Sequence, residues 1–111
     1  IMLNHVNNGK LSLERFVDLV CHGPQRIYNI VRKGRIAVGY DADFTLVDMQ
    51  KEQTITNEAM ACKSGWTPYH GKKVKGWPTH TIIRGSVIMQ NGELVGQQQG
   101  QPVRFEDMNQ F

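Results

Sequence analysis

The four histidines are the first residues to consider for chemistry, because an imidazole can bind a metal ion or carry a proton near neutral pH. They are His5, His22, His70 and His80. None of them forms a His-x-His or His-x-x-x-His pair, so no short spacing places two imidazoles on one face of a strand or helix. Asp41 and Asp43 resemble the start of a calcium loop, but the glycine and final glutamate of such a loop are missing. We therefore predict no metal site here, and we interpret Asp43 as the cap of its own turn.

Cys21 and Cys62 are the candidate nucleophiles. A reactive thiolate needs a positioned base, and the sequence adjacency of Cys21 and His22 does not establish one. The chain also lacks a Gly-x-Ser-x-Gly motif. We predict structural roles for both cysteines. The pair leaves open one disulfide or two thiols, and the absence of a recognisable secretory leader favours thiols.

A group of cations and aromatic residues raises the possibility of nucleic-acid binding, because single strands stack on aromatic rings beside positive charge. It comprises Lys63, Trp66, Tyr69, His70, Lys72, Lys73, Lys75 and Trp77. The competing interpretation is a loop anchored by its rings, with the lysines in water. We favour the second, since the net charge is only +3 and no nucleic-acid-binding motif accompanies the cluster. The glycines at 65 and 71 do not fit a P-loop, which has a different spacing.

The length of the chain, 111 residues, allows one domain or a piece of one. Its first residue is Ile1, which favours a processed or partial chain. No apolar run approaches the roughly 20 residues that span a bilayer, and no signal peptide is recognisable. We therefore expect a cytoplasmic protein with no membrane partner.

Three helical stretches are predicted in the first third of the chain. Residues 1–9 place apolar side chains at helical spacing and end at an Asn-Gly pair. Ser12 is a favourable N-cap for a second helix that ends near residues 21–23. Pro24 fits the first position of a third, short helix whose inward face includes Ile27. A tight turn is expected between the second and third helices.

The rest of the chain is predicted to form short strands. Residues 44–47, 54–56, 79–84, 86–90 and 93–95 have strand composition, and residues 58–78 read mostly as a loop. Arg84-Gly85 and Asn91-Gly92 are predicted to be tight turns, the second a strong two-residue hairpin signal. Residues 97–101 form a polar break before a tail. A sheet of three or four such strands is marginal alone.

Three segments, in order, resemble the cyclic amidohydrolases. Residues 11–17 and 23–28 are similar to the last helices of their barrel, and Lys33–Asp48 is similar to the strand by which their chain re-enters a small β domain. The pieces Trp66-Thr67-Pro68-Tyr69-His70-Gly71, Lys75-Gly76-Trp77-Pro78 and Thr81-Ile82-Ile83-Arg84-Gly85-Ser86-Val87 resemble dihydroorotases in particular, as does Gln101-Pro102-Val103-Arg104-Phe105.

The resemblance implies an α+β fragment: the last helices of a (β/α)8 barrel at residues 1–33, most of a small β-sandwich domain with hairpins at 34–96, and a polar break and tail at 97–111. The parent enzyme would interconvert dihydroorotate and N-carbamoyl-L-aspartate in pyrimidine biosynthesis, using zinc bound by His-x-His, a carbamylated lysine, two further histidines and an aspartate. None of those motifs occurs in this sequence. We therefore assign no catalytic, substrate-binding or metal-binding residue, and expect the segment alone to be inactive and structural.

Several alternatives remain open. Allantoinases, hydantoinases and dihydropyrimidinases of the same superfamily have similar C-terminal segments. A non-catalytic homologue acting as a scaffold or binding partner, or a basic nucleic-acid-binding module, would belong to another functional class. The expected partners are the remainder of the same chain, with its barrel and N-terminal strands, and the small-molecule substrate dihydroorotate. A homodimer is also compatible with the resemblance.

Overall fold

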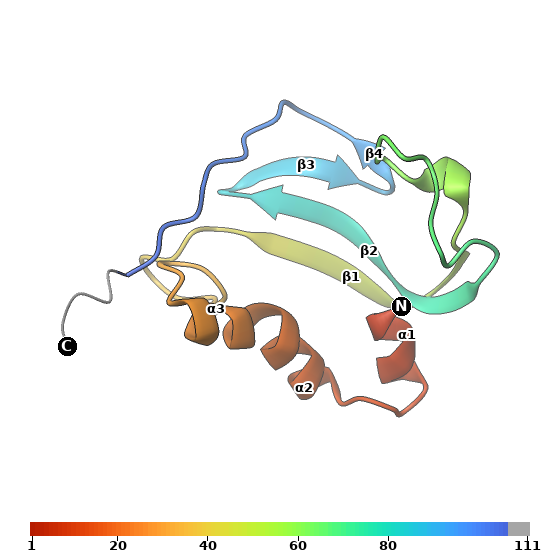
Figure 1. Ribbon diagram of the computed structural model, residues 1–111, viewed down its shortest axis with the longest axis horizontal. Helices are drawn as coiled ribbons and strands as arrows, with labels where there is room; N and C mark the ends of the chain where they lie inside the picture. The colour runs from red at the N-terminus through yellow and green to blue at the C-terminus, as the bar shows by residue number, and fades with distance from the viewer. Residues whose placement is uncertain (107–111) are drawn as a thin grey trace.

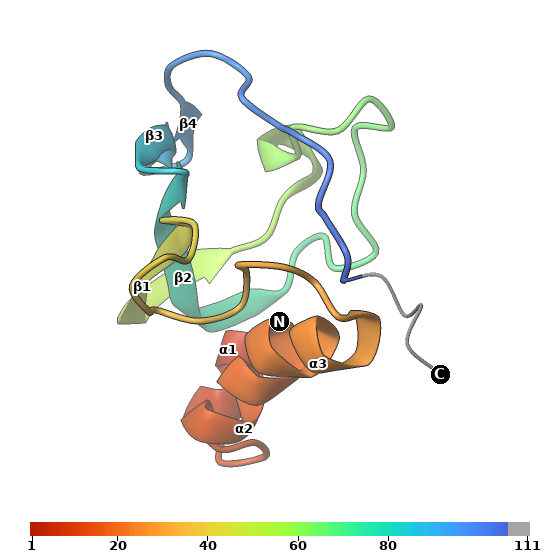
Figure 2. The same ribbon diagram turned by 90° about the vertical axis from the view of Figure 1, so that its left-hand side faces the viewer.

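The computed structural model describes residues 1–106 and shows a four-stranded antiparallel sheet with helices beyond its β1–β2 side (Figure 1). A view turned by 90° shows the same arrangement, with the helices below the twisted sheet (Figure 2). The helical elements are α1 (Met2–Asn7), α2 (Leu13–Val17), a π-helical turn η1 (Asp18–His22), α3 (Gly23–Tyr28) and a short 3₁₀ turn η2 (Asn57–Ala59). The strands, in the order β1-β2-β3-β4, are β1 (Phe44–Thr54), β2 (Lys73–Ile83), β3 (Ser86–Gln90) and β4 (Glu93–Leu94).

The helices after α1 form one continuous run instead of two helices joined by a tight turn. Ser12 is the predicted N-cap, and its Oγ accepts the N–H of Arg15 at 3.1 Å. The predicted break near residues 21–23 is wrong, because the chain passes through η1 without leaving the helical conformation. Pro24 has no N–H to donate to the preceding turn, and the wider π turn accommodates this loss. Gly23 is needed there, since a Cβ would lie 2.9 Å from the Asp18 carbonyl oxygen.

Strand β1 is longer than the strand predicted at residues 44–47 and runs on to Thr54. The separate strand expected at 54–56 is wrong, because only its first residue is in a strand and that residue belongs to β1. Asp48, which looked like the end of a strand, instead forms an irregularity within it. Its Oδ1 accepts the N–H groups of Gln50 at 2.9 Å and Lys51 at 3.2 Å, and the pairing with β2 shifts between Asp48 and Glu52. The strand then continues beyond this bulge to Thr54.

Strand β2 begins at Lys73, so the prediction of a loop over residues 58–78 is wrong for its last six positions. Pro78 pairs with Val47, beside a second register shift between Leu46 and Val47. Proline has no N–H to donate, and an irregularity of this kind tolerates that loss. Both predicted turns are confirmed. Arg84 and Gly85 have φ values of 44° and 81°, and Asn91 and Gly92 have φ values of 50° and 85°. Positive φ at both central positions is the signature of hairpin turns that match strand twist.

The described chain has almost no interior. Leu3, Ile55 and Val74 are the buried hydrophobic residues, and no side chain is fully enclosed. Ile27, predicted to face inward, is 74% exposed. The accessible surface is 8609 Å². A compact protein of this size exposes only about 6200 Å². The helices and strands are therefore formed, but most of their apolar side chains remain at least partly exposed to solvent.

The segment after β4 returns to the helices (Figures 1 and 2). Val31 donates its N–H to the Arg104 carbonyl at 2.9 Å, Glu106 donates to the Asn29 carbonyl at 3.0 Å, and Ile30 forms a bridge with Phe105. These contacts fix the part of the tail up to Glu106 beside the end of α3. Residues 107–111 of that tail lie outside the described part. The complete barrel and sandwich implied by the resemblance remain predictions, as do the boundaries 1–33, 34–96 and 97–111.

Candidate functional site

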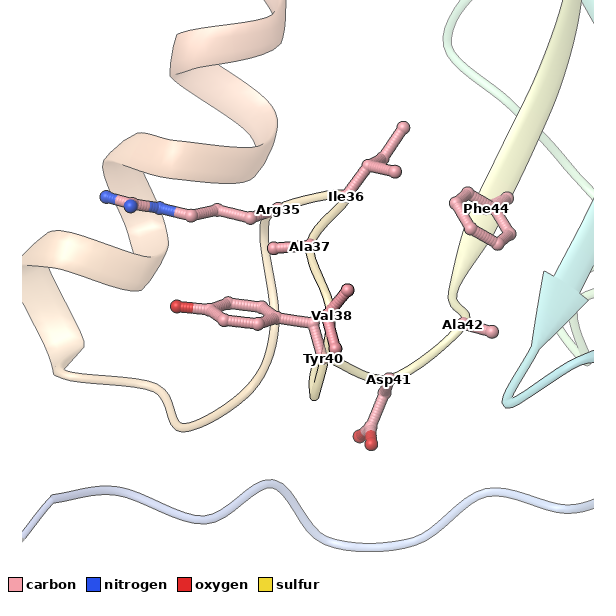
Figure 3. Close-up of a pocket in the computed structure, with 8 residues that line it drawn as sticks. All are labelled: Arg35, Ile36, Ala37, Val38, Tyr40, Asp41, Ala42 and Phe44. Carbon is pink, nitrogen blue, oxygen red and sulfur yellow. The ribbon is translucent and has the colours of Figure 1, made fainter.

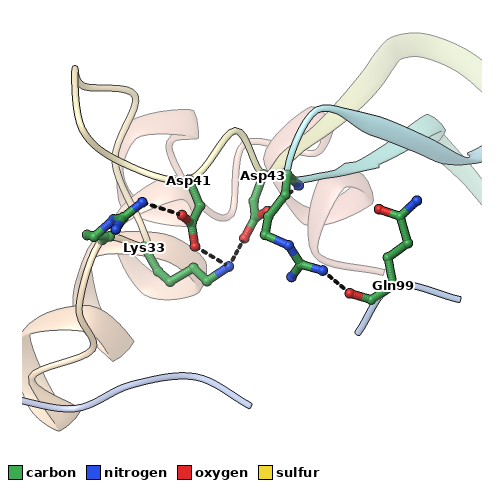
Figure 4. A network of polar contacts seen from close by, with 6 residues as sticks. Lys33, Asp41, Asp43 and Gln99 are labelled. Carbon is green, nitrogen blue, oxygen red and sulfur yellow. Dashed lines mark hydrogen bonds and ion pairs between the residues drawn. The ribbon is translucent and has the colours of Figure 1, made fainter. Parts of the chain in front are cut away.

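The most highly connected group of charged side chains surrounds the loop that links the helices to β1 (Figure 4). Lys33 Nζ lies 2.9 Å from Asp41 Oδ2 and also forms an ion pair with Asp43 Oδ2. Asp43 Oδ1 accepts the backbone N–H of Arg84 at 2.8 Å. We call these four residues the Lys33 network. It ties both ends of the loop to each other and to the β2–β3 turn.

The local sequence explains why the loop folds this way. Gly34 has φ of 80°, and a Cβ there would lie 2.7 Å from the carbonyl oxygen of Cys21 in η1. The chain therefore passes directly over the helix at a position that only glycine allows. Asp41 donates its N–H to the Arg32 carbonyl at 3.0 Å, which closes the other end of the loop.

The charges within the Lys33 network stabilise one another. Hydrogen bonds to Asp43 and then Asp41 raise the pKa of Lys33. The hydrogen bond to Lys33 lowers the pKa of Asp41. Burial of Asp43 opposes ionisation, but Lys33 and the Arg84 N–H together outweigh it and lower the pKa of that carboxyl. Each group is thus held in its charged form and has a partner, which suits a structural role better than proton transfer.

This geometry corrects the interpretation of Asp43 as the cap of its own turn. Its side chain binds Arg84, which is 41 positions away, and Lys33 at the opposite end of the loop. Sequence reasoning missed the network. The one local signal was a lysine and two aspartates at the ends of a glycine-containing loop.

Beside the network is a shallow, mainly apolar hollow (Figure 3). Ile36 is 87% exposed and Val38 is fully exposed, and Phe44 forms the opposite side. Arg35 and Tyr40 extend away from Phe44. The hollow presents no converging polar groups to orient a substrate, so it has the character of a packing surface.

The histidines are dispersed. His70 Nδ1 accepts the Asn57 N–H at 2.9 Å, and His80 Nδ1 lies 3.0 Å from Thr79 Oγ1. His5 lies in α1 and His22 in η1. Within residues 1–106, no three histidine, cysteine or acidic side chains gather in a way that could hold a metal ion.

Both cysteines are free thiols. Cys62 is exposed, and its Sγ lies 3.1 Å from Ser64 Oγ. The Ser64 hydroxyl, followed by the backbone N–H of Gly65, lowers the pKa of the Cys62 thiol. Cys21 is half-buried in η1. Among residues 1–106, the side-chain hydrogen bond shown for a thiol is that of Cys62 with Ser64.

The cation–aromatic cluster is divided between two elements. Trp66 is 60% exposed and Tyr69 is 46% exposed, and both lie in the segment between η2 and β2. Trp77 belongs to β2 and is half-buried. Lys73 and Lys75 lie on the same strand. The three rings therefore do not belong to a single loop, contrary to the expectation from the sequence.

Comparison with known proteins places these features in a family. Residues 1–88 match the amidohydrolase family. The dihydroorotase of Pyrococcus furiosus is 42% identical over 93% of this chain, and that of Pyrococcus abyssi is 43% identical over the same share. The D-hydantoinase of Ralstonia pickettii is 42% identical over 83%. In each case the chain covers a quarter or less of the relative's own length.

Solved structures give the same result. The L-hydantoinase (dihydropyrimidinase) from Arthrobacter aurescens superimposes with a TM-score of 0.82 and 33% identity, over 87% of this chain and 22% of that one. A D-hydantoinase superimposes with a TM-score of 0.77 and 41% identity, over 84% of this chain and 21% of that one. The antiparallel sheet and its helices are thus a recurrent part of larger hydrolases.

Proposed function

This chain belongs to the amidohydrolase family, and we propose that it is the C-terminal segment of a cyclic amidohydrolase that acts on dihydroorotate. The observation that carries the proposal is the 42% and 43% identity to two dihydroorotases over 93% of the chain. Water would add across the ring amide of dihydroorotate, breaking the C–N bond to give N-carbamoyl-L-aspartate. Pyrimidine biosynthesis is the proposed setting.

Hydantoin or dihydropyrimidine hydrolysis is the second candidate. It is favoured by the 42% identity to a D-hydantoinase and by the TM-score of 0.82 to an L-hydantoinase. The dihydroorotases of Pyrococcus furiosus and Pyrococcus abyssi match over 93% of this chain, against 83% for the D-hydantoinase of Ralstonia pickettii. That additional coverage is the reason to rank dihydroorotate first.

Zinc is the metal that the proposed activity implies, and the described residues do not fit it. Among residues 1–106 no three histidine, cysteine or acidic side chains gather as ligands, and the carboxylates of Asp41 and Asp43 are both ion-paired with Lys33. We therefore derive no reaction step from residues 1–106. In this proposal the zinc ligands belong to the part of the parent protein that this chain does not cover.

The proposed role of the segment is to support the parent enzyme by packing against its remainder. Its accessible surface exceeds that of a compact protein of equal size by about 2400 Å². The exposed apolar residues of α2, such as Leu13 and Val17, would pack on the barrel. Strand β1 ends the strand order, with an outer edge that no strand covers among the described residues. Strands preceding the barrel would cover that edge.

The test is a substrate comparison with the complete polypeptide that carries this sequence, purified with zinc. We expect kcat/KM for dihydroorotate to exceed that for hydantoin, dihydrouracil and allantoin by at least about tenfold, as a site built around a substrate carboxylate should discriminate. The 111-residue chain alone serves as the control and should show no turnover. A preference for hydantoin or dihydrouracil would replace the first candidate with the second. Inactivity towards all four would refute both.

A further inference from the structure

Helix α1 contacts the sheet in an unusual way at Lys75 of β2. Both backbone groups of Lys75 are bound by asparagine side chains of α1. The Lys75 N–H is donated to Asn4 Oδ1 at 3.0 Å, and the Lys75 carbonyl accepts from Asn7 Nδ2 at 2.8 Å. Strand β3 pairs with β2 only from His80 onward. Two side chains of a helix thus supply the donor and acceptor that a neighbouring strand residue would supply.

Asn7 also connects α1 to β1. Its Nδ2 lies 3.1 Å from the Met49 carbonyl and 3.3 Å from the Leu3 carbonyl of its own helix. Met49 lies inside the β1 bulge, where the ladder between β1 and β2 is interrupted. One side-chain amide therefore joins the helix to both strands at the edge of the interruption, where the pairing resumes at Glu52 and Lys75.

Close packing surrounds these bonds. Leu3 and Val74, two of the three buried hydrophobic residues among those described, are the sequence neighbours of Asn4 and Lys75. Gly76 lies against the helix, and a Cβ there would lie 2.9 Å from Leu3 Cβ and 3.0 Å from Asn7 Nδ2. The apolar side chains of α2 and α3 contrast with this, since many of them are exposed. The joint between α1 and the sheet is therefore closely packed, with two of the three buried hydrophobic residues of the described chain beside it in sequence.

We propose that Asn4 and Asn7 are positioning residues that substitute for a strand at Lys75 and fix α1 rigidly to the sheet. The inference rests on the proposed function, in which the reacting groups lie in the chain that precedes α1. Three hydrogen bonds hold α1 to the sheet, so the end of the segment that precedes α1 has a fixed position relative to the sheet. Displacements of about 1 Å at reacting groups can lower a rate by roughly a hundredfold, so such a joint would affect turnover from a distance.

The experiment compares one chemical change at two positions of the same helix in the complete polypeptide. Asn7→Asp removes the donor and places a carboxylate against the three carbonyl oxygens of Leu3, Met49 and Lys75. Asn4→Asp keeps an acceptor for the Lys75 N–H and is the matched control. Asn7→Ala removes the donor without adding a charge, in case Asn7→Asp fails to fold. The readouts are kcat and KM for dihydroorotate, melting temperature, and amide exchange at Lys75.

We expect the Asn7 variants to lower kcat by about tenfold or more, with KM within roughly threefold, and to accelerate exchange at Lys75. Asn4→Asp should leave both kcat and exchange near the wild-type values. Faster exchange and a lower melting temperature with unchanged kcat would overturn the positioning role. Because the Lys75 N–H is bonded to Asn4, unchanged exchange in both Asn7 variants would show that Asn7 does not hold α1 against the sheet, and would overturn its role in the joint. A wild-type protein with slow Lys75 exchange but no cyclic-amidase activity would instead refute the proposed function and leave the joint standing.

Discussion

Removing the Asp43 carboxylate should loosen the β2–β3 turn specifically. In Asp43→Ala, Arg84 loses the acceptor that receives its N–H at 2.8 Å. A hydrogen bond to a charged group contributes about 1.5–3 kcal/mol, and we take about 1–2 kcal/mol because the Asp43 side chain is 33% exposed. At 1.36 kcal/mol per tenfold change, amide exchange at Arg84 should accelerate roughly 5- to 30-fold.

Amide hydrogen exchange followed by NMR at neutral pH measures this effect at a single residue. Asp43→Asn keeps an oxygen acceptor and should change the exchange of Arg84 by less than about threefold. Asp41→Ala removes the other carboxylate bound to Lys33 but leaves the Arg84 bond intact, so it is the control for loss of the ion pair. Equal acceleration in Asp41→Ala and Asp43→Ala would refute the view that the Asp43–Arg84 bond holds the turn.

The effect should also depend on pH with a defined sign. The pKa of Asp43 is lowered in the folded protein, so its stabilising contribution is present above the unfolded value of about 3.9. That contribution is lost as the pH falls through the lower, folded pKa. The protection of Arg84 in the wild type and in Asp43→Ala should therefore converge in strong acid and remain separate at neutral pH. Convergence already at pH 6 would contradict the lowered pKa.

Other perturbations have equally direct outcomes. The isolated 111-residue chain should neither hydrolyse dihydroorotate nor bind zinc stoichiometrically in calorimetry; one-to-one tight binding would contradict this. It should also be marginally stable or prone to aggregate, because no strand within residues 1–106 covers the outer edge of β1; a sharp monomeric melt near about 60 °C would count against that expectation. In the complete polypeptide, Gly34→Ala should lower the free energy of unfolding by about 1–3 kcal/mol more than Gly39→Ala. Both glycines have positive φ, but of the two only Gly34 has a neighbouring atom within 4 Å of an added Cβ. Chemical denaturation would measure the difference.

Local turn chemistry was the part of the fold most accessible to sequence reasoning. Asn91-Gly92 and Arg84-Gly85 required positive φ at adjacent positions, a demand that few residue pairs meet. The Ser12 cap was likewise readable, because a hydroxyl before an apolar helical pattern accepts a nearby N–H. These features depend on a few neighbouring residues and were predicted correctly.

Features that depend on distant partners were not predicted. Pro24 was interpreted as the start of a separate helix because proline is common there, and nothing local distinguishes that from the π turn of η1. Asp48 resembled a strand terminus, whereas its side chain stabilises a bulge inside β1. The early part of β2 contains Gly76 and Pro78, which are typical of a loop. In the structure Gly76 makes room for α1, and Pro78 lies beside a register shift.

The candidate site shows the same limit. The Lys33 network joins positions 33, 41, 43 and 84, and its last member is brought close only by the β2–β3 turn. Asn4 and Asn7 reach Lys75 across about 70 positions of sequence, as their separations of 71 and 68 show. The prediction that no catalytic or metal-binding residue lies in this chain remains a prediction.

The most direct test of the central claim is dihydroorotate hydrolysis by the complete polypeptide and by a version that ends immediately before Ile1. The complete protein should convert dihydroorotate to N-carbamoyl-L-aspartate. The shortened version should lose that activity, because it lacks the sheet and helices that this segment contributes. Full activity without residues 1–111, or no turnover of dihydroorotate by the complete protein, would contradict the assignment of this chain as the supporting C-terminal segment of a dihydroorotase.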